Sequence, residues 1–477
     1  MPRPTLRVSD EVPAPIRAGY LLLRDKLEVP DAYPAAAVEE AGKAAAGLVF
    51  PDRDLTGVPF ITIDPATSTD LDQAVHIERR GTGYRIHYAI ADLTGFVAPG
   101  GPLDEEVHRR GVTLYAPQER TPLHPPVLAE GAASLLAGQL RSAHVWTHDL
   151  DASGERVRST VVAARVRSRE QLSYREAQNR IDAGSGDLTL RLLQEVGELR
   201  LAREAARGGV SLPIPEQQVS ATASGWELTF RAGLPVEQWN AQVSLLTGMA
   251  AASLMLDAGV GILRTLPPIR PDAVARLRRV ARALGIRWDS ATGYPAFVRT
   301  LAPAEPRHAA MLNACTTVFR GAGYAAFDGA PPDQPLHGAM NAPYAHCTAP
   351  LRRLVDRYAS QICVAVCADD PVPGWVREAL PRLPDTMAAT TRRASSYERG
   401  IVNLTEALVL TGREGESFDA TVIGWAAETG RGEVQIGRPA IQAPMEAADT
   451  AAVSLGSSIP VRLTTVDLLE GRVGFSG

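Results

Sequence analysis

The segment TIDPATSTDLDQ, residues 62–73, carries Asp64, Asp70 and Asp72 directly behind the apolar run VPFITI. Carboxylates this close in the chain repel one another unless water or a cation lies between them. If VPFITID (58–64) is a buried strand, Asp64 stands at its end and the following loop brings the other two back past it. Such an oxygen-only cluster suits Mg²⁺. The alternative is a solvated turn, because Asp, Ser and Thr also favour turns and helix N-caps.

Composition describes an ordinary globular chain. Its 477 residues are 45% hydrophobic and 22% charged, which is enough for several domains. The net charge of −5 argues against nucleic-acid binding over the whole surface, but it leaves room for a local basic channel. Lys occurs only at positions 26 and 43, so nearly every cation is Arg, whose planar fork suits phosphate. No run resembles a membrane span or a signal peptide, and we expect a cytoplasmic protein.

The pattern along the chain changes three times, which predicts an α+β protein. Residues 1–52 read as short helices. Residues 53–412 begin with strands and loops to about residue 165 and then become mostly helical, as expected for a mixed sheet with surrounding helices. Residues 413–477 return to short alternating strands typical of a small antiparallel barrel of the OB type.

The order of motifs resembles the ribonuclease II family, whose catalytic part is the RNB domain. Asp64, Asp70 and Asp72 match the first three acidic positions of that family's loop, and Gln73 replaces the fourth. The C-terminal strands resemble its S1 RNA-binding module. Further matches follow in the family's order: AIADLTGFV (89–97), LDEEVHRRGVTLYAP (103–117), TPLHPP (121–126), SLLAG (134–138), QLSYREAQ (171–178), YAHCTAPLRRLVDRY (344–358) and YERGIV (397–402).

The resemblance implies a metal-dependent, processive 3′-to-5′ exoribonuclease that hydrolyses single-stranded RNA to nucleoside 5′-monophosphates. Asp64, Asp70 and Asp72 would bind Mg²⁺, or Mn²⁺, and Asp72 is the acidic residue we expect turnover to depend on most. Arg352 would contact the scissile phosphate; an ion pair with Asp356 at i+4 is its structural alternative. Glu398 would position the water or a second metal, and a surface ion pair is the alternative there.

The resemblance also assigns residues that bind substrate. Tyr115 would stack on the terminal base, although it could equally be a core tyrosine. Thr348, Arg353 and His337 would line the RNA site, with Arg353 as a second phosphate contact. Trp226 and Phe230 are candidates for a further stacking aromatic.

Many family members begin with two cold-shock barrels, which cannot fit before residue 60. We therefore expect a small helical or winged-helix-like element in their place. We also expect the protein to be a monomer. Two other functions remain open. One is an RNB-scaffold RNA-binding or regulatory protein with impaired catalysis, marked by Gln73. The other is a DNA-directed nuclease, which rests only on the metal chemistry.

Overall fold

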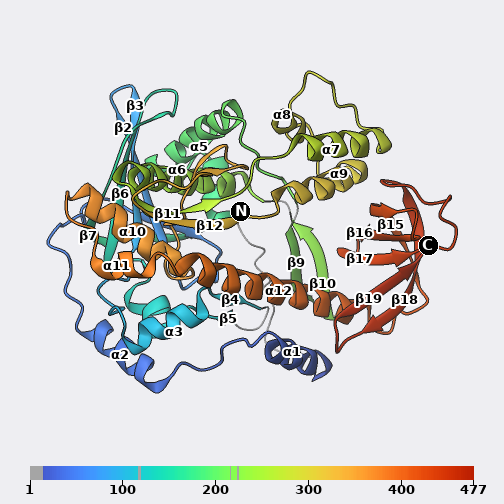
Figure 1. Ribbon diagram of the computed structural model, residues 1–477, viewed down its shortest axis with the longest axis horizontal. Coiled ribbons are helices and arrows are strands. Elements are labelled where there is room, and N and C mark those ends of the chain that lie inside the picture. The colour runs from blue at the N-terminus through green and yellow to red at the C-terminus, as the bar shows by residue number, and fades with distance from the viewer. Residues whose placement is uncertain (1–13, 117–119, 215, 223–224, 232) are drawn as a thin grey trace.

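A six-stranded mixed sheet forms the centre of the larger part of the molecule (Figure 1). The computed structural model describes the chain except residues 1–13, 117–119, 215, 223–224 and 232. The strand order is β7-β6-β3-β2-β1-β8, with β1 and β8 parallel and the other neighbours antiparallel. The strands are β1 (Ile61–Asp64), β2 (Gln73–Arg80), β3 (Gly83–Ala91), β6 (Leu140–Leu150), β7 (Arg156–Arg167) and β8 (Glu170–Ser173).

Helices pack on this sheet and bury a continuous apolar core. α5 contacts β2, and α10 contacts both β7 and α6. A capping box between Ser173 and Glu176 starts α4 directly after β8. The helices of this part are α4 (Tyr174–Asp182), α5 (Leu188–Ala206), α6 (Pro235–Ala258), α10 (Leu354–Cys367) and α11 (Gly374–Ala379).

α6 is long and apolar enough to span a bilayer by length and composition alone. Half of its most apolar window is buried inside the protein, and Val243, Leu246 and Met255 belong to the main core. This is the pattern of a core helix, which passes the same test.

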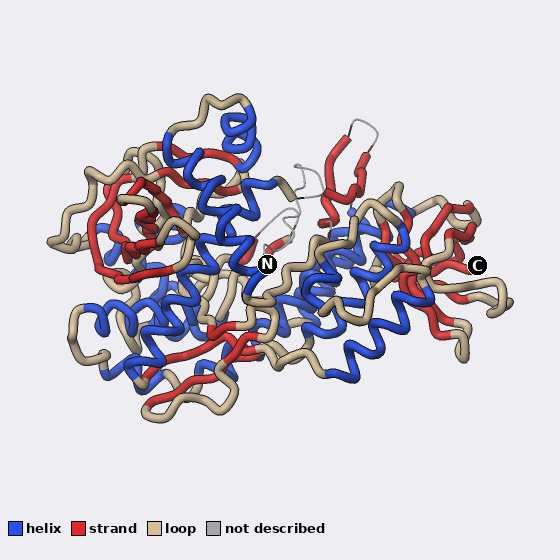
Figure 2. Tube along the Cα trace, turned by 90° about the horizontal axis from the view of Figure 1, so that it is seen from above, coloured by secondary structure: helices blue, strands red, loops and turns tan. Residues whose placement is uncertain are grey.

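The remaining elements before the barrel are mostly short. In Figure 2 the hairpin of β9 and β10 projects from the body of the molecule. The elements are α3 (Pro102–Arg110), β4 (Leu114–Tyr115), β5 (Arg120–Thr121), η1 (Val127–Ala132), β9 (Glu216–Thr222), β10 (Gly225–Arg231), β11 (Val260–Thr265), α7 (Pro271–Ala283), α8 (Tyr294–Val298), α9 (Pro306–Thr316), η2 (Thr317–Phe319), β12 (Gly323–Asp328), β13 (Leu336–His337) and β14 (Ala342–Pro343).

The 28-residue helix α12 (Leu383–Leu410) joins the sheet region to the barrel (Figure 1). Its last turn puts Ala407 and Leu410 into the barrel's own core. The barrel is closed, in the order β15-β16-β17-β19-β18. Its strands are β15 (Ser417–Ala426), β16 (Arg431–Ile436), β17 (Ile441–Glu446), β18 (Ser458–Asp467) and β19 (Arg472–Ser476). The predicted α+β class, with a mixed sheet and a small OB-type barrel, is confirmed.

The N-terminal segment contains two separate helices, α1 (Ala14–Lys26) and α2 (Ala35–Ala46). α1 packs on α12, whereas α2 packs on α3 and η1 (Figure 1). Residues 14–52 contain no strand, so a winged-helix arrangement finds no wing in this part of the chain. The first 13 residues lie outside the described part.

Two regions expected to be helical contain strands. QLSYREAQ begins with β8, and α4 starts only at Tyr174. The stretch between α5 and α10 contains β9 to β14 in addition to its helices. β8 pairs with β1 and β11 pairs with β12, each across more than 50 residues, whereas β9–β10 and β13–β14 are local pairs. β8, β13 and β14 are only two to four residues long, so local periodicity gives little sign of them.

Candidate active site

β1 and β2 place Asp64 and Asp72 at the two ends of one short loop, and Asp70 lies within that loop. β1 ends at Asp64, and Asp72 immediately precedes β2. Ser134 holds the connecting loop: its Oγ accepts from Leu71 N at 2.9 Å and donates to Thr69 O at 2.7 Å. The loop is therefore a fixed structure, and the solvated-turn alternative does not fit Asp72, which is 5% exposed.

Asp72 also organises the turn that carries Arg352. Its Oδ1 accepts a hydrogen bond from Leu351 N at 2.8 Å, and its Oδ2 lies 3.5 Å from Arg352 Nε. The Arg352 side chain is 46% exposed, against 7% for Asp72. The guanidinium thus contacts the carboxylate from one side and keeps a free face for a ligand. Asp356, the alternative partner of Arg352, instead receives two hydrogen bonds from Arg353.

Tyr115 is brought beside Arg352 by backbone pairing between distant segments. Thr113 N donates to Arg352 O at 3.0 Å, and Leu354 N donates to Gly111 O at 3.0 Å. The strand β4 then places Tyr115 against the acidic loop. Burial raises the pKa of Tyr115 to about 12; Arg352 opposes this shift and Asp70 adds to it.

The acidic pair is held at an electrostatic cost. Burial raises the pKa of Asp64 to about 7; nearby Arg352 opposes the shift and Asp70 adds to it. Burial likewise raises the pKa of Asp72 well above its usual range, against the effects of Arg352 and the Leu351 N–H. A bound cation near these carboxylates would oppose both pKa shifts.

The donor set fits a divalent cation such as Mg²⁺. Within the described residues, no three Asp, Glu, His or Cys side chains form a ready-made metal cage. Mg²⁺ does not need one, because it is usually held by one or two carboxylates together with water and substrate phosphates. Asp64 and Asp72 provide those carboxylates.

Asp70 is engaged differently from the other two. Its Oδ1 receives a hydrogen bond from Arg120 Nη1 at 2.5 Å, and Arg120 also contacts Thr69 and Glu130. An internal cation thus already neutralises Asp70. To bind a metal, Asp70 would use its second oxygen or release Arg120.

The Gln73 side chain is held by hydrogen bonds to both ends of its amide. Its Nε2 donates to Thr348 O at 2.6 Å, and its Oε1 accepts from Tyr88 Oη at 2.5 Å and from Ser244 Oγ at 3.3 Å. The amide NH₂ group of Gln73 must face the Thr348 carbonyl oxygen, so the hydrogen-bond partners fix which way the amide points. Gln73 links β2 to the Arg352 turn.

The other predicted residues have contacts of their own. Thr348 is buried and engages Gln73 through its carbonyl. Arg353 pairs with Asp356, and its phosphate contact stays a prediction. His337 packs edge-on against Tyr344, and burial lowers its pKa to about 4, so it is neutral near pH 7. Glu398 is half-buried on α12, the helix that contacts β4.

The additional stacking candidates lie elsewhere. Phe230 packs against the barrel core, and the Trp226 side chain lies outside the described residues.

Sequence reasoning missed three residues that build the site. Ser134 clamps the loop, and Arg120 neutralises Asp70. Tyr174, at the start of α4, lies near Asp64: burial raises its pKa and the Asp64 charge adds to the shift. The only sequence signal was that Ser134 and Tyr174 fall within quoted motifs.

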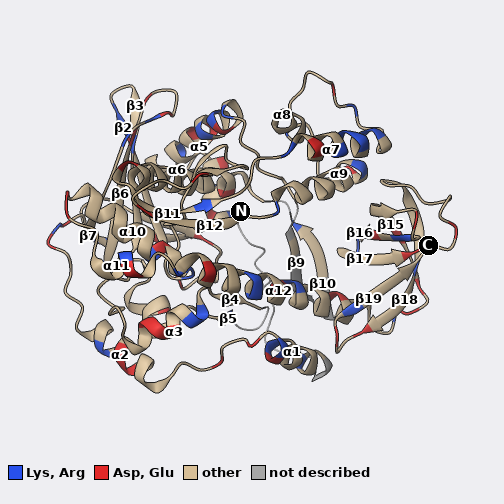
Figure 3. Ribbon diagram, in the orientation of Figure 1, with Lys and Arg blue, Asp and Glu red and all other residues tan. Residues whose placement is uncertain are grey.

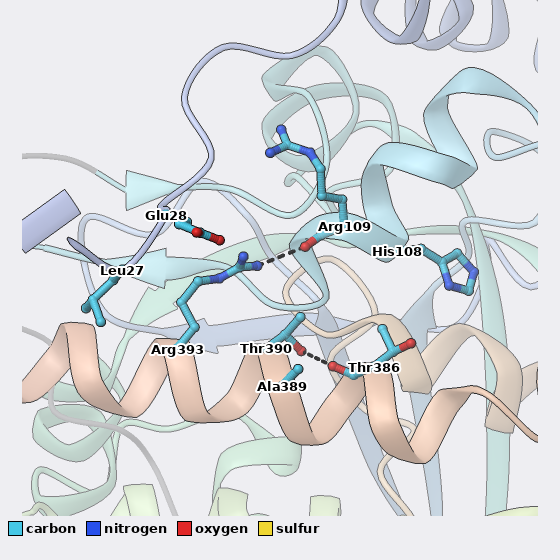
Figure 4. Close-up of a pocket in the computed structure, with 8 residues that line it drawn as sticks. All are labelled: Leu27, Glu28, His108, Arg109, Thr386, Ala389, Thr390 and Arg393. Carbon is cyan, nitrogen blue, oxygen red and sulfur yellow. Dashed lines mark hydrogen bonds between the residues drawn. The ribbon is translucent and has the colours of Figure 1, made fainter. Parts of the chain in front are cut away.

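A cavity of about 430 Å³ is lined by none of the predicted site residues (Figure 4). Residues after α1, on α3 and on α12 line it. Arg393 crosses it to donate to the carbonyls of Arg109 and Arg110, each at 2.9 Å. These hydrogen bonds from Arg393 attach α12 to the end of α3, the segment that leads to β4.

Comparison with known proteins identifies the architecture. Residues 52–368 match the RNB domain, and residues 416–476 match the RNase II-type exonuclease C-terminal S1 domain. Because the first match covers more than half of the chain, the protein belongs to the RNB-domain family.

Curated relatives are longer proteins. Ribonuclease R of Escherichia coli (strain K12) is 27% identical over 69% of this chain and 42% of its own length. The exosome complex exonuclease RRP44 homolog A of Arabidopsis thaliana is 26% identical over 74% of this chain and 39% of its own. The chain therefore spans about two-fifths of the length of these relatives.

Solved structures share the fold at low identity. Mycoplasma genitalium RNase R, in complex with ribose methylated single-stranded RNA, superposes with a TM-score of 0.84 at 17% identity, over 97% of this chain and 78% of that one. Yeast Ssd1, a pseudonuclease, superposes with a TM-score of 0.67 at 16% identity, over 87% of this chain and 51% of that one. These matches establish the fold alone.

Proposed function

We propose that the protein is a metal-dependent, processive 3′-to-5′ exoribonuclease that releases nucleoside 5′-monophosphates from single-stranded RNA. The observation that carries the proposal is the grouping of the partly buried Asp64 and the buried Asp72 near the half-exposed Arg352, with Tyr115 alongside. Relatives named Exoribonuclease 2, Ribonuclease R and exosome complex exonuclease support the same activity.

Each residue has a physical task in that reaction. Arg352 stabilises the charge that grows on the phosphoryl oxygens, because its free face can approach the phosphate while Asp72 holds its other side. Tyr115 offers an aromatic face to the terminal base, which seats the next phosphate over the acidic pair. Asp64 and Asp72 would hold Mg²⁺ or Mn²⁺. That ion would supply a hydroxide nucleophile and neutralise the phosphate.

The test compares the wild type with Asp72→Asn on a single-stranded RNA labelled at its 5′ end, with Mg²⁺ or Mn²⁺. Asn keeps an oxygen that can accept from Leu351 N, so the turn is preserved while the charge is lost. We expect hydrolysis to fall by about a hundredfold or more, with RNA binding retained. Asp52→Asn, an exposed carboxylate outside the site, is the matched control.

Three results would overturn the proposal. RNA binding without cleavage by the wild type would favour a catalytically impaired RNA-binding protein, the second candidate, which Gln73 alone motivates. Preferential cleavage of DNA would favour a DNA nuclease. Cleavage by Asp72→Asn at the wild-type rate would refute the site.

The proposal extends to a monomer that acts in the cytoplasm on the 3′ end of RNA. Light scattering of the purified protein checks the monomer.

A further inference from the structure

The segment between β11 and β12 is strongly basic in an acidic protein. Residues 270–320 contain nine arginines and only three acidic residues, whereas the whole chain has a net charge of −5. The S1-like barrel has the opposite balance: residues 416–476 contain four arginines and eight acidic residues. A barrel with excess negative charge is a poor electrostatic partner for the phosphates of RNA.

Three arginines of this segment form a stripe on α7. Arg276, Arg279 and Arg282 are three residues apart and exposed, while Leu277 and Ala281 bury the other face. In the described part of the chain, none of the three makes an ion pair or a side-chain hydrogen bond. Like charges at this spacing destabilise a helix by a few tenths of a kcal/mol per pair. An anionic partner would offset that cost.

The neighbouring Arg278 shows what a structural arginine looks like in the same helix. Its guanidinium stacks over Trp288 at 4.4 Å from the ring centroid and donates to several backbone carbonyls, including Thr292 O at 2.9 Å. The stripe residues make no such contacts, so packing does not explain them.

The stripe continues onto α9 and reaches the barrel. α7 ends in a tight turn in which Ile286 N donates to Ala281 O, with Gly285 at φ 67°. A Cβ at Gly285 would lie 3.3 Å from Arg307 of α9, and a Cβ at Gly456 would contact both Leu284 and Arg307. Gly456 lies in the barrel loop between β17 and β18. Figure 3 shows the basic colour on α7 and at the end of α9 that faces the barrel.

We propose that this surface, formed by Arg276, Arg279, Arg282 and Arg307, binds the phosphodiester backbone of RNA upstream of the active site. It supplies the positive charge that the adjoining barrel lacks. The contacts are to phosphates, so the surface is indifferent to base sequence. The inference rests on the proposed function, because it assumes that the 3′ end of the same RNA enters the active site.

The test uses the full chain with Arg276→Ala, Arg279→Ala and Arg282→Ala combined. RNA binding is measured by fluorescence anisotropy in chelator, so cleavage does not enter. Two labelled RNAs are used, one shorter and one well longer than the roughly 4–16 nucleotides that an OB fold covers. We expect the Kd of the long RNA to rise on the order of tenfold, and the slope of log K against log salt to shrink by about 2, at about 0.7 per lost phosphate contact. The short RNA should bind, and be hydrolysed with Mg²⁺, as by the wild type.

The matched control combines Arg158→Ala, Arg167→Ala and Arg191→Ala, three exposed arginines on β7 and on α5, the helix that packs on β2. Equal losses of affinity for the long RNA in the two triple variants would show a general charge effect and overturn the proposal. Unchanged affinity and salt slope for the α7 variant would overturn it while leaving the nuclease function standing. Failure of the wild type to bind either RNA would remove both.

Discussion

Replacing Asp64 with Asn should stabilise the metal-free protein at pH 8 and leave it nearly unchanged at pH 4. The pKa of Asp64 is raised from 3.8 to about 7 by burial. Between these values the folded protein keeps a proton that the unfolded chain releases, so its stability falls as pH rises from about 4 to about 7. Three pKa units correspond to about 4 kcal/mol. Because Asp64 is only partly shielded from solvent, this figure is an upper limit, and a gain of about 1–4 kcal/mol is expected.

Urea denaturation in chelator at pH 4, 6 and 8 measures this effect directly. Asp52→Asn, an exposed carboxylate, serves as the control. Excess Mg²⁺ at pH 8 should raise the stability of the wild type more than that of Asp64→Asn, because the ion binds only the folded state. A variant as stable as the wild type at pH 8, or a difference that does not change with pH, would refute the claim that Asp64 is ionised at a cost.

Other perturbations test the neighbouring contacts. Arg352→Ala should lower the single-turnover cleavage rate by about 10²–10³, and Arg352→Lys by less; equal rates for Ala and wild type would contradict a phosphate contact. Tyr115→Ala should weaken RNA binding by about 1–3 kcal/mol in anisotropy titrations while Tyr115→Phe binds normally, whereas a core role predicts lost thermal stability instead. Gln73→Glu should cost about 1–3 kcal/mol in urea denaturation, because a carboxylate oxygen would face the Thr348 carbonyl oxygen; an unchanged midpoint would contradict this. Ser134→Ala should lower the free energy of unfolding by a similar amount and should weaken Mg²⁺ binding measured by calorimetry. Unchanged stability and unchanged Mg²⁺ affinity would show that the loop between β1 and β2 does not need Ser134.

Local pattern predicted the elements whose stability is local. The amphipathic periodicity of α7, the long apolar run of α6 and the alternation of β7 and β18 were visible in the sequence, because each has a long amphipathic or buried face. The four-residue strand β8 was not visible. Its hydrogen bonds go to β1, more than 100 residues earlier, and its sequence EQLS has no distinctive alternation.

The site likewise combines a local feature that the sequence shows with long-range contacts that it does not. The spacing of Asp64, Asp70 and Asp72 indicated a cluster, but the contact between Asp72 and Arg352 spans 280 positions and only the family resemblance suggested it. The i+4 alternative for Arg352 fails for a local reason. Helix α10 begins at Leu354, after an extended Arg353 with φ −148°, so helical spacing does not apply to a residue that precedes the helix. Arg120 carried no signal, because its partner Asp70 lies 50 residues away.

Gln73 shows how a departure from a family pattern changes meaning once its contacts are known. In the sequence, loss of the fourth acidic residue is a marker of impaired catalysis. In the structure, the amide donates to Thr348 O and accepts from Tyr88, a pairing that a carboxylate cannot make with both partners. The substitution therefore has a structural reason that is independent of the reaction. Arg120 donates a close hydrogen bond to Asp70. Among the three aspartates of the opening segment, Asp64 and Asp72 receive no such hydrogen bond from a cationic side chain in the described residues, since Arg352 lies 3.5 Å from Asp72. An active site of this kind must draw more of its cation's ligands from water and the RNA phosphate than a four-carboxylate site does, so its metal affinity should depend more strongly on bound substrate.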